Sequence, residues 1–382
     1  MIPYGRQEIT DDDVRAVEAV LRSDFLTQGP AVPSFERAVA ASCGATHAVA
    51  VNSATSALHV ACMALGLGPG DRLWTTPITF VASANCGLYC GAQVDFVDID
   101  PQTYNLSIEH LTSKLESAER LGTLPKIVVP VHMCGQPCDM EAIYALGKQY
   151  GFRIIEDASH ALGATFQGEP VGNCRYSDIT VFSFHPVKII TTGEGGMAVT
   201  NDTKLAADMV LLRSHGITRE AGRMEAINPP PWAYEQQMLG FNYRMTDIQA
   251  ALGTSQMSRL DGWVERRDAL ARRYDRLLSD LPIAKPNVKA GRRSAWHLYV
   301  IRVASEQRGG VFAAMRAARI GVNVHYTPVH LQPYYRRLGF NLGLFPQAEA
   351  YGKEAMSLPL FPAMTEIMQD TVISAMYDGL PK

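Results

Sequence analysis

The chain carries the stretch Ser183-Phe184-His185-Pro186-Val187-Lys188, and a glycine-rich turn, Thr191-Thr192-Gly193-Glu194-Gly195-Gly196, follows it closely. Residues 179–184, before the lysine, are mostly apolar, which is typical of a buried strand. An earlier apolar run, residues 152–155, ends in Glu156 and Asp157, and His160 lies just beyond. The sequence therefore predicts an amine and a carboxylate at the ends of two buried strands.

A lysine and a carboxylate in this arrangement suit the chemistry of pyridoxal 5′-phosphate (PLP). The Lys188 amine would form a Schiff base with the aldehyde of PLP, and Asp157 would pair with the pyridinium nitrogen, so that the ring acts as an electron sink. Burial lowers the pKa of a lysine, which would let Lys188 also move protons. We expect His160 near the ring hydroxyl and Ser183 near the cofactor. The alternative is that Asp157 only caps a turn.

A second polar segment follows the apolar run at residues 47–51. It reads Asn52-Ser53-Ala54-Thr55-Ser56-Ala57-Leu58-His59 and is expected to open a helix that runs to about residue 65. Backbone N–H groups at a helix N-terminus attract anions, and the hydroxyls of Thr55 and Ser56 would add donors for a phosphate. Ordinary helix capping by the same residues is the alternative.

The spacing of apolar runs predicts an α/β fold with a mostly parallel sheet. Several runs are almost continuously apolar, as in strands that are covered on both faces, and they alternate with helical patterns. One such helix is capped by Thr10, and another covers residues 139–150. The predicted strands are residues 47–51, 71–76, 93–97, 127–131, 152–155, 179–183 and 197–200.

The pattern changes after residue 246. A long helical tract, interrupted at Gly253 and Gly262, is expected to run to about residue 281, followed by a strand at 296–303 and a helix at 311–319. We interpret residues 1–255 as a large PLP-binding α/β domain and residues 256–382 as a smaller C-terminal α+β domain. Residues 229–232 form a proline-rich loop of a kind that is often functional.

Composition excludes several classes of partner. The 382 residues include 35 basic and 38 acidic residues, a net charge of −3, which gives no electrostatic basis for binding nucleic acid or an anionic membrane. No run approaches the roughly 20 apolar residues of a spanning helix, and the N-terminus lacks the apolar region of a signal peptide. We therefore expect a cytoplasmic protein.

The seven cysteines are an odd number, which argues against a complete disulfide framework. Cys86 and Cys90, and also Cys134 and Cys138, repeat at a spacing of four residues, but zinc sites usually use tighter pairs. We expect buried thiols and no metal site.

Taken in order, these motifs resemble the DegT/StrS sugar aminotransferases, which share the aspartate-aminotransferase fold (fold type I). The resemblance covers essentially the whole chain. It rests on the segments already quoted and on Gly29-Pro30, Thr76-Pro77-Ile78-Thr79-Phe80-Val81-Ala82 and Asn242-Tyr243-Arg244-Met245. It implies PLP as cofactor, with pyridoxamine 5′-phosphate (PMP) as its aminated form.

The resemblance also implies roles for single residues. Thr55, Ser56 and Ser183 would bind the cofactor phosphate, and Phe80 would stack on the ring. Asn242 would reach the cofactor of the neighbouring subunit, which implies a homodimer with shared active sites. Ala54 and His160 depart from the family, where many members have Gly and Gln.

A subgroup is suggested by the lysine stretch together with Val324-His325-Tyr326-Thr327-Pro328-Val329-His330-Leu331-Gln332-Pro333-Tyr334-Tyr335-Arg336. Both are similar to aminotransferases of pseudaminic acid biosynthesis. These transfer the amino group of L-glutamate to C4 of a UDP-linked 4-keto-6-deoxy-N-acetylhexosamine. Arg244, His325 and Tyr326 are the candidates for holding the substrate.

Three alternatives to this reading differ in chemistry. A related 3-dehydrase would carry His in place of Lys188. A regulator or sensor that binds PLP without turnover is not supported, because we see no appended DNA-binding domain and every expected catalytic group is present. Within the aminotransferases, the acceptor could be another nucleotide-linked 4-keto-6-deoxy sugar.

Overall fold

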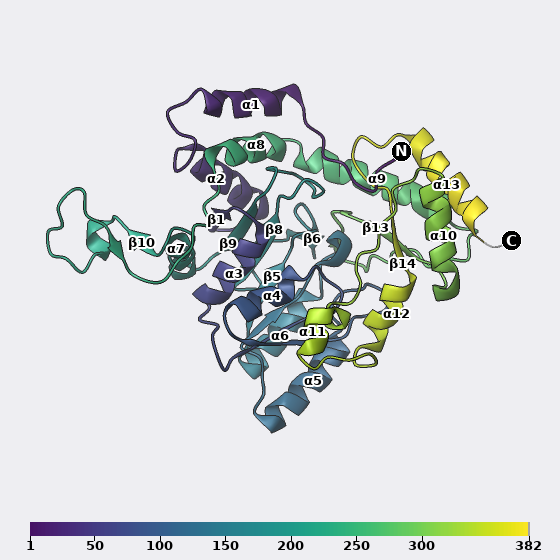
Figure 1. Cartoon of the computed structure of the whole chain (residues 1–382), viewed down its shortest axis with the longest axis horizontal. Coiled ribbons are helices and arrows are strands. Elements are labelled where there is room, and N and C mark those ends of the chain that lie inside the picture. Colours follow the sequence, from purple (N-terminus) through teal and green to yellow (C-terminus); the bar gives the residue numbers. More distant parts are fainter. Residues whose placement is uncertain (381–382) are drawn as a thin grey trace.

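The computed structural model describes residues 1–380, and a seven-stranded sheet forms the centre of the large region (Figure 1). Strand β9 runs antiparallel to both of its neighbours, whereas the other pairs are parallel. This confirms the predicted α/β class with a mostly parallel sheet. In spatial order the strands are β1 (His47–Val51), β9 (Gly196–Thr200), β8 (Ile179–Ser183), β5 (Arg153–Asp157), β4 (Ile127–Val129), β2 (Arg72–Thr75) and β3 (Gln93–Phe96).

Helices cover both faces of this sheet. Successive strand residues point to opposite faces, so that Ile155 packs with one core cluster and Ile154 with another. The first face is covered by α3 (Ala54–Ala64), α4 (Ala82–Tyr89) and α7 (Thr203–Leu212). The second is covered by α2 (Ala31–Cys43), α5 (Ile108–Leu121), α6 (Met140–Tyr150) and α8 (Asp247–Met257).

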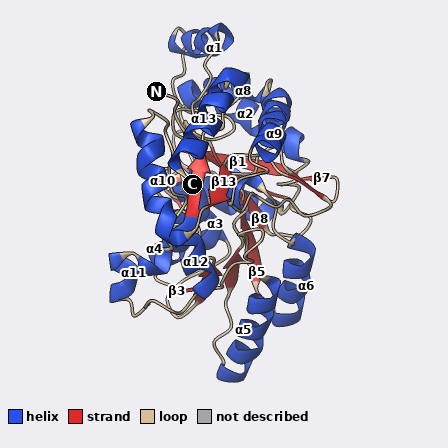
Figure 2. Cartoon of the chain, turned by 90° about the vertical axis from the view of Figure 1, so that its right-hand side faces the viewer, coloured by secondary structure: helices blue, strands red, loops and turns tan. Residues whose placement is uncertain are grey.

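The C-terminal third forms its own apolar cluster around a two-stranded antiparallel sheet (Figure 2). The sheet pairs β13 (Tyr299–Arg302) with β14 (Ala355–Leu358). The helices of this part are α9 (Leu260–Leu277), α10 (Ser305–Ala317), α11 (Pro333–Arg337), α12 (Pro346–Glu354) and α13 (Glu366–Gly379). The division between two domains at residue 255 stays a prediction.

Short elements complete the chain. A three-stranded sheet joins β12 (Arg292–Arg293), β6 (Thr165–Phe166) and β7 (Glu169–Pro170). A two-stranded hairpin, β10 (Ile217–Thr218) and β11 (Glu235–Gln236), projects from the body at the left of Figure 1. Short 3₁₀ helices lie at Met133–Gly135, Ala221–Arg223 and Val329–Leu331.

The N-terminal helix α1 (Asp11–Leu21) begins where the sequence predicts it. The Thr10 backbone N–H donates to the Asp13 carboxylate at 2.9 Å, which closes the first turn. The apolar stripe of this helix is not part of the core, because Val14 and Leu21 are exposed.

The predicted interruptions of the long helical tract at Gly253 and Gly262 are wrong. Both glycines lie inside helices, and the break falls at Ser258 and Arg259. The Ser258 hydroxyl donates to the Ser255 carbonyl at 2.7 Å, which competes with the continuing helix. Gly253 serves packing instead, because a Cβ there would lie 2.6 Å from the Phe35 ring of α2.

Two predicted elements in the C-terminal third have different bounds. Strand β13 starts at Tyr299 rather than at residue 296, because Trp296 has a φ of 49°, which is incompatible with an extended strand. Helix α10 starts at Ser305, before the predicted position 311, and continues through Gly309 and Gly310.

None of the helices in residues 1–380 combines the length and the apolar character needed to cross a bilayer. All seven cysteines are free thiols, and Cys90 and Cys134 are the two that are only partly buried. Across the described residues, no group of three or more His, Cys, Asp and Glu side chains is arranged to hold a metal ion.

Candidate active site

The carboxylate of Asp157 stands at the carboxyl end of β5, on the face of the sheet that α3 and α4 cover. The side chain is buried, and both oxygens accept hydrogen bonds. Oδ1 accepts the Ser159 backbone N–H at 3.1 Å, and Oδ2 accepts the Ser83 hydroxyl at 2.6 Å. The carboxylate is thereby fixed in one orientation.

Lys188 lies on a turn after β8, where its backbone N–H donates to the His185 carbonyl at 2.9 Å. Burial lowers the pKa of its amine to about 8, although the nearby charge of Asp157 acts in the opposite direction. A lysine with this pKa is partly neutral near pH 7 and can act as a nucleophile or as a base. The structure therefore brings the predicted amine and carboxylate within electrostatic reach of each other.

Three histidines lie within electrostatic reach of this amine. Burial is the main reason that the pKa values of His160, His297 and His325 lie below the ordinary range, and the positive charge of Lys188 adds to the effect. For His325 the pKa falls to about 4. The rings of His160 and His297 are 4.3 Å apart. All three imidazoles are therefore neutral at physiological pH.

Tyr326 connects His160 to the C-terminal third. Its hydroxyl lies 3.3 Å from Nε2 of His160, and its ring centroid is 6.3 Å from that of Phe80. Nδ1 of His325 and Oγ of Ser357 are hydrogen-bonded at 2.7 Å. Of the predicted substrate residues, His325 and Tyr326 therefore lie beside the Lys188 group.

The predicted phosphate-binding residues lie at the ends of β1 and β8, at the same edge of the sheet as Asp157. Helix α3 begins at Ala54 with Ser53 as its cap, and Ser53 Oγ accepts the Ser56 backbone N–H at 3.1 Å. The Ser56 hydroxyl donates to Asn52 Oδ1 at 2.6 Å. Capping and an anion site therefore use the same turn.

Strand register places Ser183 in this group. Val51 of β1 pairs with Gly196 of β9, and Gly196 pairs with Ser183 of β8. A Cβ on Gly196 would lie 2.5 Å from backbone atoms of Ser53 and Ala54. Only glycine lets the first turn of α3, with Thr55, approach the strand ends so closely.

Asn242 and Arg244 lie beside this turn rather than beside Lys188. The Asn52 backbone N–H donates to the Tyr243 carbonyl at 2.8 Å, and Val51 forms a bridge with Arg244. Asn242 is exposed, and Arg244 donates to Ser214 Oγ at 3.4 Å. No contact in residues 1–380 joins Arg244 to His325 or Tyr326.

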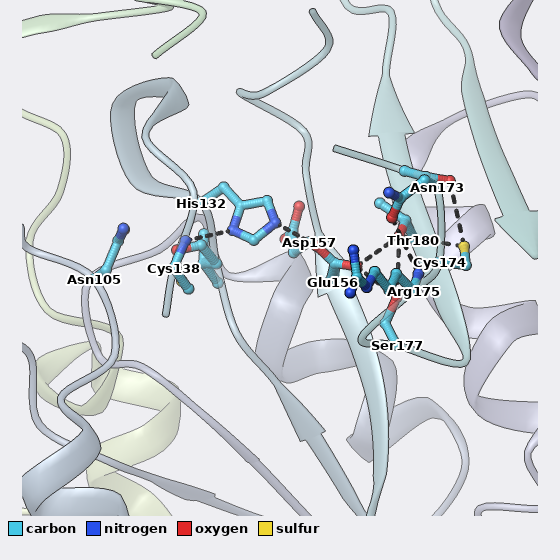
Figure 3. A network of polar contacts seen from close by, with 12 residues as sticks. Asn105, His132, Cys138, Glu156, Asp157, Asn173, Cys174, Arg175, Ser177 and Thr180 are labelled. Atoms are coloured by element: carbon cyan, nitrogen blue, oxygen red, sulfur yellow. Dashed lines mark hydrogen bonds and ion pairs between the residues drawn. The ribbon is translucent and has the colours of Figure 1, made fainter. Parts of the chain in front are cut away.

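On the face of the sheet opposite Asp157, a buried polar network binds Glu156 of β5 (Figure 3). His132 Nε2 and Glu156 Oε2 are 2.7 Å apart, and His132 Nδ1 accepts the Cys138 backbone N–H at 3.1 Å. The ring proton is therefore on Nε2 and is donated to Glu156. Burial would raise the pKa of Glu156, but hydrogen bonds from His132, Ser177 and Thr180 lower it overall.

These residues fit PLP. Nδ1 of His160 is buried and has no hydrogen-bond partner within residues 1–380, so it is available to a bound group. The Phe80 ring is 59% exposed, which leaves a face for stacking. Gly196 lets the first turn of α3 pack directly against the strand ends, and the backbone N–H groups of that turn would hold a phosphate.

Three residues of this site were not predicted from the sequence: Thr79, Ser83 and His297. His297 stands within the apolar run at 296–303, where a lone histidine was a usable signal. Thr79 lies in a quoted motif but had no assigned role, and Ser83 follows the last residue of that motif, Ala82. Ser83 contacts Asp157, Thr79 contacts Ser83, and His297 contacts His160. These contacts depend on tertiary structure, which sequence periodicity does not report.

Comparison with known proteins gives consistent matches. A model of the DegT/DnrJ/EryC1/StrS aminotransferase family matches residues 7–377. The spore coat polysaccharide biosynthesis protein SpsC of Bacillus subtilis (strain 168) is 41% identical over 384 residues, covering 99% of this chain and 96% of SpsC.

Solved structures agree with the sequence matches. Spr1654 of Streptococcus pneumoniae, assigned as a sugar aminotransferase, superposes in its PMP form with a TM-score of 0.90 at 28% identity, covering 100% of both chains, and it has also been solved in its PLP form. Helicobacter pylori PseC, an aminotransferase of pseudaminic acid biosynthesis, superposes with a TM-score of 0.89 at 31% identity, covering 99% of this chain and 98% of PseC. These likenesses confirm the fold.

Proposed function

Because the chain belongs to the DegT/DnrJ/EryC1/StrS aminotransferase family, we propose that it transfers the amino group of L-glutamate to C4 of a UDP-linked 4-keto-6-deoxy-N-acetylhexosamine. It is a PLP-dependent sugar aminotransferase, and the proposal concerns its donor and acceptor. The product would be UDP-4-amino-4,6-dideoxy-N-acetyl-β-L-altrosamine, a precursor of pseudaminic acid. The likeness to PseC over nearly the whole chain supports this acceptor.

One observation carries the proposed chemistry: the Lys188 amine, with its pKa lowered to about 8, lies within electrostatic reach of Asp157. When bound, PLP supplies an electron sink and carries the amino group between the two substrates. Neutral Lys188 Nζ can take the α-proton of the amino donor and deliver a proton to C4 of the sugar in the second half of the reaction. Asp157 would face the pyridine nitrogen.

Neighbouring side chains support these proton movements. Neutral His160, His297 and His325 add no positive charge that would compete for Asp157 or further suppress protonation of Lys188. Tyr326 is positioned by His160 at 3.3 Å and would contact the sugar or the cofactor rim. Thr55, Ser56 and Ser183 would hold the phosphate at the N-terminus of α3.

We also infer a homodimer with shared active sites. The hairpin of β10 and β11 projects from the body and exposes Ile227 (91%) and Trp232 (77%) on one loop, and large apolar side chains that are exposed together favour a protein–protein contact. Val14 and Leu21 of α1 are also exposed. Exposed Asn242 lies at the base of this hairpin and would reach the cofactor of the neighbouring subunit.

A second acceptor has its own support. SpsC is more similar to this chain, at 41% identity, than PseC is, at 31%, and SpsC acts in spore coat polysaccharide biosynthesis. Another nucleotide-linked 4-keto-6-deoxy sugar is therefore the alternative acceptor. Arg244 and His325 are the side chains we would examine for sugar selectivity.

Absorbance of the PLP-loaded protein tests the proposal. We expect glutamate to bleach the visible cofactor band and the UDP-linked 4-keto-6-deoxy-N-acetylhexosamine to restore it. A band that is restored only by a different nucleotide-linked 4-keto sugar would favour the second acceptor. A band that glutamate does not change would contradict the assigned donor.

A further inference from the structure

Two buried hydroxyl groups stand in line behind the Asp157 carboxylate. Ser83, in the first turn of α4, places Oγ 2.6 Å from Asp157 Oδ2. Thr79, in the loop before α4, places Oγ1 2.6 Å from Ser83 Oγ. Ser83 is 0%, Thr79 2% and Asp157 5% exposed. Bulk water therefore does not compete for these hydrogen bonds.

The direction of donation follows from the number of protons. A serine hydroxyl has one proton, and Ser83 donates it to the carboxylate, since Oδ2 at 2.6 Å is much closer than the alternative acceptor, the Phe80 carbonyl at 3.3 Å. Thr79 must then donate to Ser83 Oγ. The two hydroxyl dipoles thus point the same way, toward the negative charge, and each strengthens the other.

We propose that Ser83 and Thr79 are positioning residues that keep Asp157 ionised and aimed at the pyridine nitrogen, so that the proton between them stays on the nitrogen. This rests on the proposed pairing of Asp157 with that nitrogen. Hydrogen bonds to a carboxylate favour its charged form. Without them, the buried charge is less stable and the shared proton moves from the ring nitrogen to Asp157, which weakens the electron sink.

We call the chain of hydrogen bonds from Thr79 through Ser83 to Asp157 the relay. The loop that contains Thr79 also contains Phe80, the residue expected to stack on the cofactor ring. Phe80 lies between Thr79 and Ser83 in the chain, and its ring is exposed next to that of Tyr326. One loop would therefore set both the plane of the cofactor ring, through Phe80, and the protonation of its nitrogen, through Ser83. Neither hydroxyl would itself touch the cofactor.

The experiment is nitrogen NMR of the holoenzyme loaded with PLP that is ¹⁵N-labelled in the ring. We expect a protonated ring nitrogen in the wild type at neutral pH. Ser83→Ala should shift the proton equilibrium toward Asp157 by about 10- to 100-fold, the range for a hydrogen bond to a charged group. The turnover number with glutamate should fall, while its KM changes little.

Thr79 separates a relay from a local packing effect. Thr79→Val removes the hydroxyl at nearly constant volume and should shift the nitrogen signal in the same direction, but less than Ser83→Ala. Thr79→Ser keeps the hydroxyl and should match the wild type. In the Ser83→Ala background, Thr79→Val should have no additional effect, because the donor that it acts through is gone.

A buried hydroxyl outside the relay provides the matched control. Thr75 is fully buried on β2, and its hydroxyl donates to the Val129 carbonyl at 2.8 Å. Thr75→Val should lower the melting temperature without shifting the nitrogen signal. If Ser83→Ala shifts the signal no more than Thr75→Val does, or if Thr79→Val acts equally in both backgrounds, the relay is wrong.

The readout also separates this proposal from the proposed function. The NMR measurement involves no sugar, so a wrong acceptor leaves the relay intact. An unprotonated ring nitrogen in the wild type would overturn the pairing of Asp157 and with it this proposal. A protonated nitrogen that Ser83→Ala does not affect would overturn the relay alone.

Discussion

The Tyr326 hydroxyl lies 3.3 Å from Nε2 of His160, although 166 positions separate the two residues in the chain. His160 follows β5 of the central sheet, and Tyr326 belongs to the C-terminal third. This contact joins the two parts of the chain next to Asp157 and Lys188. The candidate site is therefore completed only when both parts have folded against each other.

Tyr326→Phe tests that contact. The ring would keep its packing with Phe80, but His160 would lose its hydroxyl partner. One neutral hydrogen bond corresponds to a fall in kcat/KM of about 2- to 10-fold. Steady-state kinetics with the melting temperature as control would measure it, and unchanged kinetics would show that the contact has no role in turnover.

The pH at which Lys188 reacts should be unusually low. Its pKa is lowered to about 8 by burial, so the amine is neutral above pH 8 and about one-tenth neutral at pH 7. Competitive acetylation of the PLP-free protein, read by mass spectrometry, should give a midpoint near pH 8. Lys204 is the control, because its contact with Asp208 raises its pKa above the ordinary value. Equal midpoints for the two lysines would contradict the burial of Lys188.

Glu156→Gln should lower the free energy of unfolding, because it weakens the buried network on the face of the sheet opposite Asp157. Glu156 loses its charge while His132, Ser177 and Thr180 still point donors at it. Hydrogen bonds to a buried charge support a loss of about 2 to 3 kcal/mol, measured by urea unfolding. Glu18→Gln, in an exposed pair with Arg22, should cost under about 1 kcal/mol. Similar losses in both variants would show that the Glu156 network is not stabilising.

Gly196→Ala should push the first turn of α3 away from the strand ends. The new Cβ would meet backbone atoms of Ser53 and Ala54 at 2.5 Å, and backbone cannot rotate aside as a side chain can. We expect a loss of about 1 to 3 kcal/mol and weaker PLP binding. Gly68→Ala is the control, because nothing lies within 4 Å of its Cβ position. Unchanged PLP affinity in Gly196→Ala would separate this turn from the phosphate site.

Substitutions in the exposed hairpin of β10 and β11 should change the oligomeric state. If the proposed dimer forms through this hairpin, Trp232→Ser combined with Ile227→Ser should convert it to monomer in sedimentation analysis, and activity should fall with it. Leu121→Ser removes an equally exposed apolar side chain at the end of α5 and should leave the dimer intact. A dimer that persists in the hairpin variant would place the interface elsewhere.

Local sequence signals predicted much of the fold, because they act over short distances. Thr10 closes the first turn of a helix as its type indicates, and the continuous apolar runs form the strands. The predicted break at Gly253 was wrong because a Cβ at this position would collide with the Phe35 ring of α2, so helix packing requires a glycine there. Glycine lowers helix propensity, but close packing against α2 outweighs this cost at Gly253 in α8.

The candidate site was predictable only in part, for a related reason. Lys188, Asp157 and His160 lie at or shortly after the ends of strands, and a polar residue after an apolar run can be recognised in the sequence. Ser83 and His297 are ordinary residues in a helix and an apolar run, and only the folded chain brings them to Asp157 and His160. A polar residue whose partner is 74 positions away leaves no periodic signal.

Glu156 and Asp157 are consecutive residues on β5, and their side chains leave the strand on opposite sides of the sheet. One belongs to the buried network around His132, and the other to the site beside Lys188. A small displacement of the strand therefore moves both. The rate of amino transfer should therefore also respond to changes in packing around His132 and Glu156. A variant that slows turnover needs a stability measurement before the loss is assigned to the chemical step.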